Sequence, residues 1–251
     1  MRVAALYDIH GNLPALSAVL ADVDAIGVDA IVVGGDVASG PMPVETLDAL
    51  RARGARFVRG NADRVLDVEG ADERETWVRA RRWVAARLGE ERLAFLGGLP
   101  LDLTVDVGRL GRVRFCHGAP GSDELTITRL TPDERLRRLL AGVSERVVVC
   151  GHTHVQFDRV VDGIRVVNAG SVGAPYEAEP AAYWALLGAD VELRRTAYDV
   201  EATIAAIVAS GYPRAAEFTG FLTPDPERPA RLSALIEGLP DPGPEPSAVE
   251  R

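Results

Sequence analysis

The stretch VAALYDIHGNLPALSAVLADVDAIGVDAIVVGGD, residues 3–36, determines the fold class of this chain. Its first apolar run, residues 3–7, predicts a buried strand, and apolar residues then recur at helical spacing over residues 13–26. A second apolar run at residues 31–33 predicts the next strand. Asn12 comes directly before the helical pattern and its first-turn proline, which indicates a helix N-cap. This strand–helix–strand order predicts a parallel sheet and an α/β fold.

Beyond residue 36 the chain continues to alternate between predicted strands and helices. Further helices are predicted at residues 44–53, 72–96, 132–140 and 200–209, and further strands at residues 56–58, 101–107, 112–116, 146–150, 157–161, 164–167, 183–187 and 192–197. Residues 1–222 are predicted to form one domain, which is long enough to bury a substantial core. Residues 223–251 are predicted to form a proline-rich tail with a short helix at residues 230–237.

The predicted helix at residues 72–96 is rich in arginine and places Trp77, Val84 and Leu88 on one stripe. Such a stripe is typical of an amphipathic helix that packs on a sheet, which is the interpretation we adopt. A mobile cap over a substrate is the alternative.

Every histidine of the chain lies in a motif that suits metal binding. Polar side chains follow five predicted strands: Asp8 and His10, then Asp36, Asn61, His117, and the pair His152 and His154. The carboxyl ends of parallel strands meet at one edge of a sheet, where sites are usually built. Imidazole and carboxylate ligands suit first-row divalent ions, so we expect two divalent metal ions, Mn, Fe, Ni or Zn.

Composition narrows the classes of partner. The net charge is −9 and all 28 basic side chains are arginines, which argues against broad nucleic-acid or membrane-surface binding. A phosphate substrate remains compatible, because a metal cluster carries its own positive charge. No apolar run reaches membrane-spanning length, and the first predicted strand begins near Arg2, so we expect a cytoplasmic protein. Cys116 and Cys150 end apolar runs and are interpreted as buried strand residues, rather than as metal ligands or a redox switch.

The motifs, taken in order, resemble those of the calcineurin-like metallophosphoesterases. The family pattern D-x-H, G-D, G-N, H and G-H-x-H is matched across residues 8–154, and the NAGSVG turn at residues 168–173 is similar to the small bacterial and archaeal phosphodiesterase branch. The resemblance covers about residues 1–200 and implies a four-layer α/β/β/α sandwich. It implies one metal held by Asp8, His10, Asp36 and His154, and a second held by Asp36, Asn61, His117 and His152, with Asp36 bridging.

The resemblance also implies a reaction. It implies a metal-dependent phosphoric ester hydrolase that cleaves phosphodiester bonds by attack of a metal-bridging hydroxide, with Asp36 and Asn61 in the catalytic centre. The expected partner is a small-molecule or nucleotide phosphate ester, and the expected assembly is a monomer or a homodimer. A phosphomonoesterase, a nucleotide pyrophosphohydrolase and a non-catalytic protein-binding scaffold, like the retromer subunit of the family, are the alternatives.

One departure concerns the third motif, where Ala62 stands in place of the family's histidine. That histidine lies beside the phosphate and protonates the leaving group, so its loss favours leaving groups that need little protonation. Asp63 normally orients the missing histidine. Here it is a candidate catalytic acid, with a purely structural role as the alternative.

A second departure concerns arginine. The branch often carries Pro-Arg after the NAGSVG turn, whereas this chain has Tyr176 after the proline. Arg59 and Arg64 flank the third motif and are candidate substrate contacts, because guanidinium groups bind phosphate through paired hydrogen bonds. The alternative is that they form solvent-facing ion pairs. Asn168 and Ser171 are interpreted as supports of a tight turn under the metal loops.

Overall fold

The computed structural model describes residues 1–64 and 74–241. One sheet contains β1 (Val3–Leu6), β2 (Ala30–Val33), β3 (Arg56–Phe57), β9 (Ala182–Leu187) and β10 (Val191–Thr196). The other contains β4 (Asp102–Val107), β5 (Gly111–Cys116), β6 (Val147–Cys150), β7 (Phe157–Val161) and β8 (Ile164–Asn168). The strand orders are β10-β9-β1-β2-β3 and β4-β5-β6-β8-β7.

The helices connect and cover these strands. They are α1 (Leu13–Ile26), α2 (Pro43–Ala52), α3 (Asn61–Arg64), α4 (Thr76–Gly97), α5 (Asp133–Leu139), α6 (Val200–Ala209), α7 (Ala215–Gly220) and α8 (Arg228–Glu237), with a 3-10 turn at Gly108–Leu110. Most predicted elements agree with the observed ones to within one or two residues at each end. Helices α3 and α7 and the 3-10 turn were not predicted, because all three are too short to show a helical period.

Each sheet contains three neighbouring parallel strands, as predicted, but β1 also pairs with β9 in antiparallel register. β1 pairs with β2 and β2 with β3 in parallel register, and so do β5 with β6 and β6 with β8. The hairpins β4–β5, β7–β8 and β9–β10 are antiparallel, so both sheets are mixed. The carboxyl ends of β1, β2, β3, β5 and β6 therefore open onto the loops that carry the candidate ligands.

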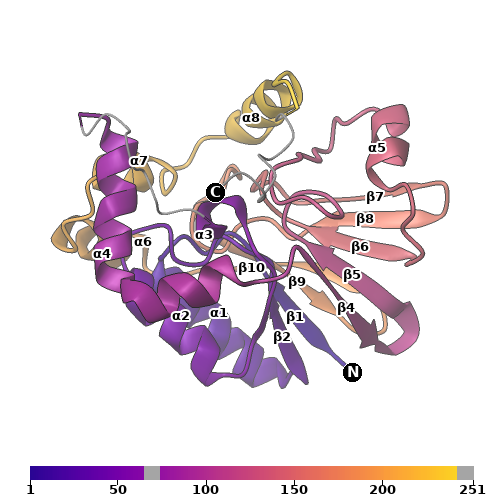
Figure 1. Ribbon diagram of the computed structural model, residues 1–251, viewed down its shortest axis with the longest axis horizontal. Helices are drawn as coiled ribbons and strands as arrows, with labels where there is room; N and C mark the ends of the chain where they lie inside the picture. The colour runs from indigo at the N-terminus through magenta and orange to yellow at the C-terminus, as the bar shows by residue number, and fades with distance from the viewer. Residues whose placement is uncertain (65–73, 242–251) are drawn as a thin grey trace.

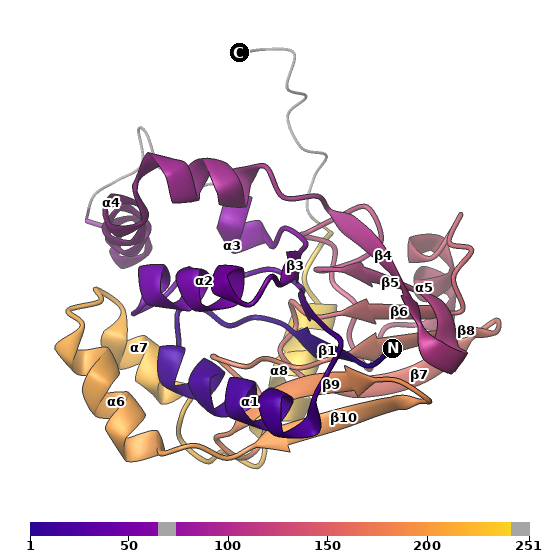
Figure 2. The same cartoon turned by 90° about the horizontal axis from the view of Figure 1, so that it is seen from below.

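The two sheets pack face to face with helices outside, which gives the four-layer α/β/β/α arrangement (Figures 1 and 2). Alternation along β1 shows why: Ala4 and Leu6 join the helix-covered core, whereas Val3, Ala5 and Tyr7 join the core between the sheets. A strand buried on both faces reads as a continuous apolar run, which is what residues 3–7 show. On the outer face of the second sheet, α5 closes a third apolar cluster.

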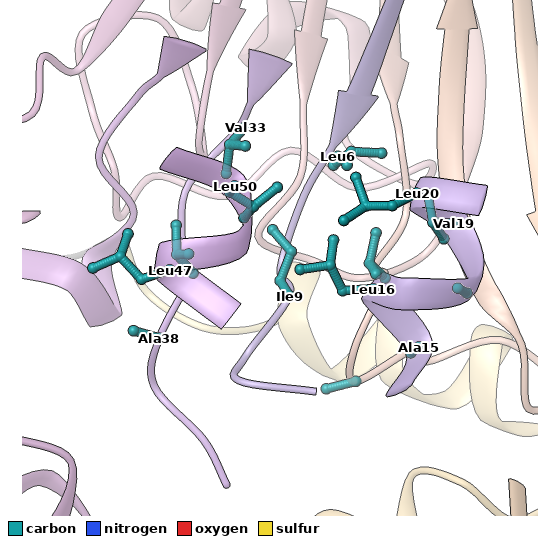
Figure 3. Close-up of a cluster of buried hydrophobic side chains, with 14 of the residues drawn as sticks. Leu6, Ile9, Ala15, Leu16, Val19, Leu20, Val33, Ala38, Leu47 and Leu50 are labelled. Atoms are coloured by element: carbon teal, nitrogen blue, oxygen red, sulfur yellow. The ribbon is translucent and has the colours of Figure 1, made fainter. Parts of the chain in front are cut away.

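Helix α1 positions the loop that carries Asp8 and His10. Asn12 caps it by accepting a hydrogen bond from the backbone N–H of Ala15 at 3.2 Å, as predicted from the sequence. Leu16 and Val19 are fully buried and lie among side chains of β1 and α2, as Figure 3 shows. The loop between β1 and α1, which carries Asp8 and His10, is therefore held at both ends by packed elements.

Helix α4 departs from its predicted stripe. It starts at Thr76, while residues 72 and 73 of the predicted helix lie outside the described residues. Val84 and Leu88 are buried as predicted, but Trp77 is 42% exposed and Val78 is buried in its place. The Arg81 guanidinium lies 5.4 Å from the centre of the Trp77 ring. Periodicity identifies a stripe, but it does not reveal whether a facing element extends far enough to cover the first turn.

The C-terminal helix contacts the rest of the molecule. Helix α8 begins two residues earlier than predicted, with Pro229 in its first turn. The Glu237 carboxylate accepts hydrogen bonds from the Thr128 and Thr131 hydroxyls, both at 2.6 Å, and Arg228 donates to the carbonyl of Phe221 at 3.0 Å. The domain boundary at residue 222 stays a prediction, and residues 242–251 of the predicted tail lie outside the described residues. No helix within residues 1–64 and 74–241 is both long and apolar enough to span a membrane.

Candidate metal centre

The seven predicted ligands come from five loops that meet at one edge of the two sheets. Asp8 and His10 follow β1, Asp36 follows β2, Asn61 follows β3, His117 follows β5, and His152 and His154 follow β6. Hydrogen bonds join neighbouring loops directly: the backbone N–H of His10 donates to the Asp36 carbonyl at 2.9 Å. Residues up to 146 positions apart in the chain are thereby brought into one cluster.

One half of the cluster contains Asp8, His10 and His154. The His154 Nε2 lies 3.2 Å from the Asp8 Oδ1 and 3.3 Å from the His10 Nε2. The His10 Nε2 is also 3.6 Å from the Asp36 Oδ2. These atoms are close enough to share one cation at ligand distances of about 2 Å.

The other half contains His117, Asn61 and His152. The His117 Nε2 lies 3.1 Å from the Asn61 Oδ1 and 3.6 Å from the Asp36 Oδ1, and the His117 and His152 ring centres are 4.9 Å apart. Asp36 thus faces one half with Oδ2 and the other with Oδ1, as a bridging carboxylate must. The Asp8 Oδ1 is within 3.9 Å of both the His10 and the His117 Nε2 atoms, so Asp8 also contacts both halves.

Backbone carbonyl groups orient the imidazole rings. The Nδ1 atoms of His10, His117 and His154 lie at 3.3, 2.8 and 2.6 Å from the carbonyl oxygens of Ser39, Gly34 and Ala174. Since a carbonyl oxygen only accepts, each Nδ1 carries the proton and each Nε2 lone pair faces the cluster. His152 is reversed: its Nε2 donates to the Glu124 carbonyl at 3.2 Å, which leaves Nδ1 as its free nitrogen.

The buried carboxylate of Asp8 favours a bound cation. The Asp8 side chain is fully buried, and its Oδ1 has no hydrogen-bond partner among the described residues. A buried carboxylate oxygen without a donor is costly unless a cation neutralises it. Burial by itself would raise the pKa of Asp8, but His154 and His117 outweigh that effect and hold it below its usual value. The donor set, imidazole nitrogens and carboxylate oxygens, fits a first-row divalent ion.

Five of the candidate ligands have strained backbones. Asp8, His10, Asp36, His152 and His154 adopt φ angles of 51°, 46°, 53°, 64° and 56°, in the left-handed region that L-residues avoid. In the described part of the chain, Asp162 is the single other non-glycine residue with positive φ. Such strain costs about 1–3 kcal/mol per residue and persists only where the surroundings enforce it. Here it coincides with the candidate ligands.

Gly60 leaves room for Asp36. A Cβ atom at position 60 would lie 2.1 Å from the Asp36 Oδ1 and 2.3 Å from its backbone nitrogen, well inside van der Waals contact. We therefore predict that Gly60→Ala displaces this carboxylate and lowers the affinity for divalent metal by at least about tenfold, the scale at which supporting groups act on metal sites. Titration calorimetry with Mn²⁺ or Zn²⁺ measures it. Gly97→Ala is the matched control, since a Cβ there meets no atom within 4 Å, and equal affinities in the two variants would contradict the prediction.

Asp63 connects the loops after β2 and β3. Its carboxylate is 3% exposed and accepts three backbone hydrogen bonds, from Asp36 at 2.7 Å, Val37 at 3.0 Å and Gly60 at 3.0 Å. Burial, followed by the Asp36 charge, raises the pKa of Asp63 to about 7 against the effect of these donors. Asp63 is not among the residues that line the cleft over the cluster. These contacts favour the structural alternative, and its catalytic role stays a prediction.

Asn168 and Ser171 lie beneath the cluster. The Ser171 hydroxyl donates to the Asp8 carbonyl at 2.7 Å, and the Asn168 side-chain amide donates to the Gly151 carbonyl at 2.7 Å. Both side chains are fully buried. They support the turns that precede His10 and His152, as the sequence analysis expects.

A cleft of about 300 Å³ opens over the cluster, lined by His10, Asp36, Asn61, His152 and His154. The predicted substrate arginines lie beside it and pair with acidic residues: Arg59 donates to Asp123 at 2.9 Å, and Arg64 pairs with Glu124. The arginines that do line the cleft are Arg81 of α4 and Arg214, just before α7. The sequence analysis missed both, since neither lies in a motif and only packing brings their helices to the site.

The sequence and the fold of this chain are similar to those of known proteins. Residues 1–190 match the calcineurin-like phosphoesterase superfamily domain. A metallophosphoesterase of Sphaerobacter thermophilus is 27% identical, with a TM-score of 0.71 over 88% of this chain and 98% of that one. A hypothetical protein of Pyrococcus horikoshii has the same fold, with 22% identity and a TM-score of 0.76 over 89% of this chain and 98% of that one. An uncharacterized protein of Methanocaldococcus jannaschii is 28% identical over 84% of this chain and 93% of its own length.

Proposed function

Because this chain belongs to the calcineurin-like phosphoesterase superfamily, we propose that it is a dinuclear-metal-dependent phosphoesterase that hydrolyses phosphodiester bonds. One observation supports the proposal: seven candidate ligand side chains converge on one cluster, which contains the buried Asp8 Oδ1 without a hydrogen-bond partner among the described residues. A cluster with two buried carboxylates and four imidazoles in a cleft needs positive charge, and a phosphate ester is the ligand that such a charge attracts.

The proposed ligand sets follow the two halves of the cluster. Asp8, His10, Asp36 and His154 would hold one ion, and Asp36, Asn61, His117 and His152 the other. Two divalent ions at such a site supply a hydroxide nucleophile near neutral pH and clamp the attacking and leaving oxygens of an in-line displacement. The protein's own contribution is to orient the imidazoles through backbone carbonyls and to keep Asp36 in contact with both halves. Mn, Fe, Ni and Zn all suit these donors.

Ala62 supports a diester over a monoester substrate. It lines the cleft, and its backbone N–H donates to the Asp36 Oδ1 at 2.8 Å, but its methyl side chain carries no proton for a leaving group. A dianionic alkyl monoester needs such a proton most, because its alkoxide is a poor leaving group. A positioned acid contributes about 10²–10⁴-fold, so its absence narrows the range of substrates.

We predict that the rate depends steeply on the leaving-group pKa, because no histidine at position 62 shares the developing charge. A series of aryl and alkyl methyl-phosphodiesters with graded leaving groups, at saturating metal, measures this slope. Ala62→His should flatten the slope by restoring a donor, and Ala62→Leu, which adds bulk but no proton, should leave it steep. A flat slope in the wild type, with the chemical step rate-limiting, would contradict the prediction and point to another acid.

An activity panel tests the proposed function itself. The protein is loaded in turn with Mn²⁺, Fe²⁺, Ni²⁺ or Zn²⁺ and assayed on bis(p-nitrophenyl) phosphate, p-nitrophenyl phosphate and a nucleoside diphosphate. Preference for the first substrate supports the diesterase. Preference for the second or third would replace it with a phosphomonoesterase or a pyrophosphohydrolase. Failure on all three with both ions bound would favour a protein-binding scaffold.

A further inference from the structure

The cleft extends beyond the candidate ligands to a surface that the proposed hydrolysis does not use. We call it the distal wall: Arg81, Tyr176, Arg214 and Phe221. Its members come from α4, from the loop before β9, and from the segment that contains α7. Two cations and two aromatic rings thus face the same space as the metal ligands.

Arg81 of α4 is a partly buried cation in the cleft lining. No ion pair to its guanidinium occurs within residues 1–64 and 74–241, where its contact is the Trp77 ring. Burial, then the charges of Arg64 and Arg214, lower the pKa of Arg81. The Asp36 charge offsets part of this effect, and an anionic ligand beside the guanidinium would offset more of it.

Arg214 is available to the same ligand. It pairs with Glu217 through Nε and Oε2 at 2.7 Å, and both side chains line the cleft. The two side chains are 36% and 52% exposed, and a pair of this kind contributes no more than about 1 kcal/mol. A phosphate group entering the cleft can therefore replace Glu217 as the partner of Arg214.

The aromatic part of the distal wall begins directly at the metal cluster. The Tyr176 ring stacks on His154, with ring centres 4.5 Å apart and planes at 29°, and Phe221 lies 5.3 Å from Tyr176. Tyr212 and Phe218 also line the cleft, and the Phe218 ring lies edge-on to Phe221 with ring centres 6.4 Å apart. A planar group joined to a phosphate at the ligand cluster would reach this apolar surface.

The basic character extends along α4. From Thr76 to Leu88 the helix carries four arginines and no acidic residue, in a protein of net charge −9. The cleft volume of about 300 Å³ is at the lower end of the range for small-molecule sites, about 300–1,000 Å³. Size and charge together point to a small anionic ligand.

We propose that the distal wall selects a nucleotide-type substrate: a phosphoester that carries a planar base, packed against Tyr176 and Phe221, and a second phosphate, bound by Arg81 and Arg214. The inference rests on the proposed function in one respect, since the first phosphate binds at the ligand cluster. It adds a substrate class that is recognised at three groups, the first phosphate, the base and the second phosphate. The base and the second phosphate can each be removed from the ligand separately.

The test measures binding, so it does not depend on turnover. Metal-loaded protein is titrated with adenosine 3′,5′-bisphosphate, with adenosine 5′-monophosphate, which lacks the second phosphate, and with ribose 5-phosphate, which lacks the base as well. We expect each step down this series to weaken binding by about tenfold, the scale of one charge-assisted hydrogen bond or one stacked base. Arg81→Gln should remove the first step alone, and Phe221→Leu the second alone, whereas Phe221→Tyr should preserve it.

Arg79→Gln is the matched control: the same change on the same helix, at an exposed arginine outside the cleft lining, should leave all three affinities unchanged. Equal wild-type affinities for the three ligands would overturn the inference. So would an Arg81→Gln variant that weakens all three equally, because that indicates a structural role. Turnover of bis(p-nitrophenyl) phosphate, which has no second anionic group, should change less than about twofold in the control Arg79→Gln, as surface substitutions generally do. Absence of that turnover in the wild type would count against the proposed function, while the binding series would still decide the substrate class.

Discussion

Asp36→Asn is expected to lower kcat of the metal-loaded protein by about 10³-fold or more, which corresponds to roughly 4 kcal/mol of lost transition-state stabilisation. Asp36 contacts His10 through Oδ2 and His117 through Oδ1, both at 3.6 Å, so it alone spans the two halves with separate oxygens. Asparagine keeps the shape but replaces one oxygen by an NH₂ group, which carries no negative charge and does not bind a cation. The spacing of the two ions and the charge between them are then lost together.

The measurement is kcat on an activated diester at saturating metal, together with circular dichroism and metal content of the purified variant. Asp24→Asn is the control, because Asp24 is an exposed carboxylate that pairs with Arg53 away from the cleft. It should retain activity within about twofold, as surface substitutions generally do. A metal-replete Asp36→Asn with a near wild-type rate would place the chemistry elsewhere in the protein.

Removal of divalent metal by a chelator is expected to abolish turnover and to lower Tm by about 5 °C or more. An ion that binds the native state at 100 times its Kd stabilises it by about 2.7 kcal/mol, and each kcal/mol corresponds to about 2–4 °C in a chain of this size. The physical cause is the Asp8 Oδ1, which is buried and has no hydrogen-bond partner among the described residues, so a cation bound at this oxygen stabilises the native state. Adding the metal back should restore both activity and Tm.

Asp8→Asn tests whether the effect of the chelator on Tm arises at the Asp8 carboxylate or elsewhere in the protein. The substitution removes the carboxylate charge that an ion at this cluster would neutralise, so the Tm of the variant should respond less to added metal than that of the wild type. Differential scanning calorimetry of both proteins, with and without metal, gives the four values required. A metal-dependent rise in Tm of the same size in Asp8→Asn and in the wild type would show that the ions stabilise some other part of the molecule.

Local signals explain how much of the fold could be predicted from the sequence. The run at residues 3–7 is buried on both faces, so its apolar character is visible without knowledge of its neighbours. Asn12 caps α1 through a contact three residues away, which is equally local. The predicted burial of Trp77 is wrong because it is not a local property. The helical phase of Trp77 is correct, but its burial depends on an element that is distant in sequence.

The candidate site likewise contains residues that local motifs predict and contacts that depend on the tertiary structure. The seven candidate ligands lie in short motifs at strand ends, and the topology of parallel strands brings such ends together, so their convergence could be predicted from the sequence. Asp63 was identifiable as a motif residue, but its bonds to three backbone N–H groups depend on the approach of two loops. Arg59 and Arg64 were chosen for their position next to a motif, whereas the structure places Asp123 and Glu124 beside them and Arg81 and Arg214 in the cleft.

The sequence by itself determined the α/β class, the positions of the strands along the chain and the set of candidate ligands, because apolar period and motif spacing are properties of neighbouring residues. Only the tertiary structure decided which nitrogen of each histidine faces the cluster, that Asp8 as well as Asp36 contacts both halves, and which arginines line the cleft. Each of these depends on a contact across tens to more than a hundred residues, such as the His117 Nδ1 with the Gly34 carbonyl. Side-chain identity shows what a residue is able to bind, and the packing of the two sheets determines what lies next to it.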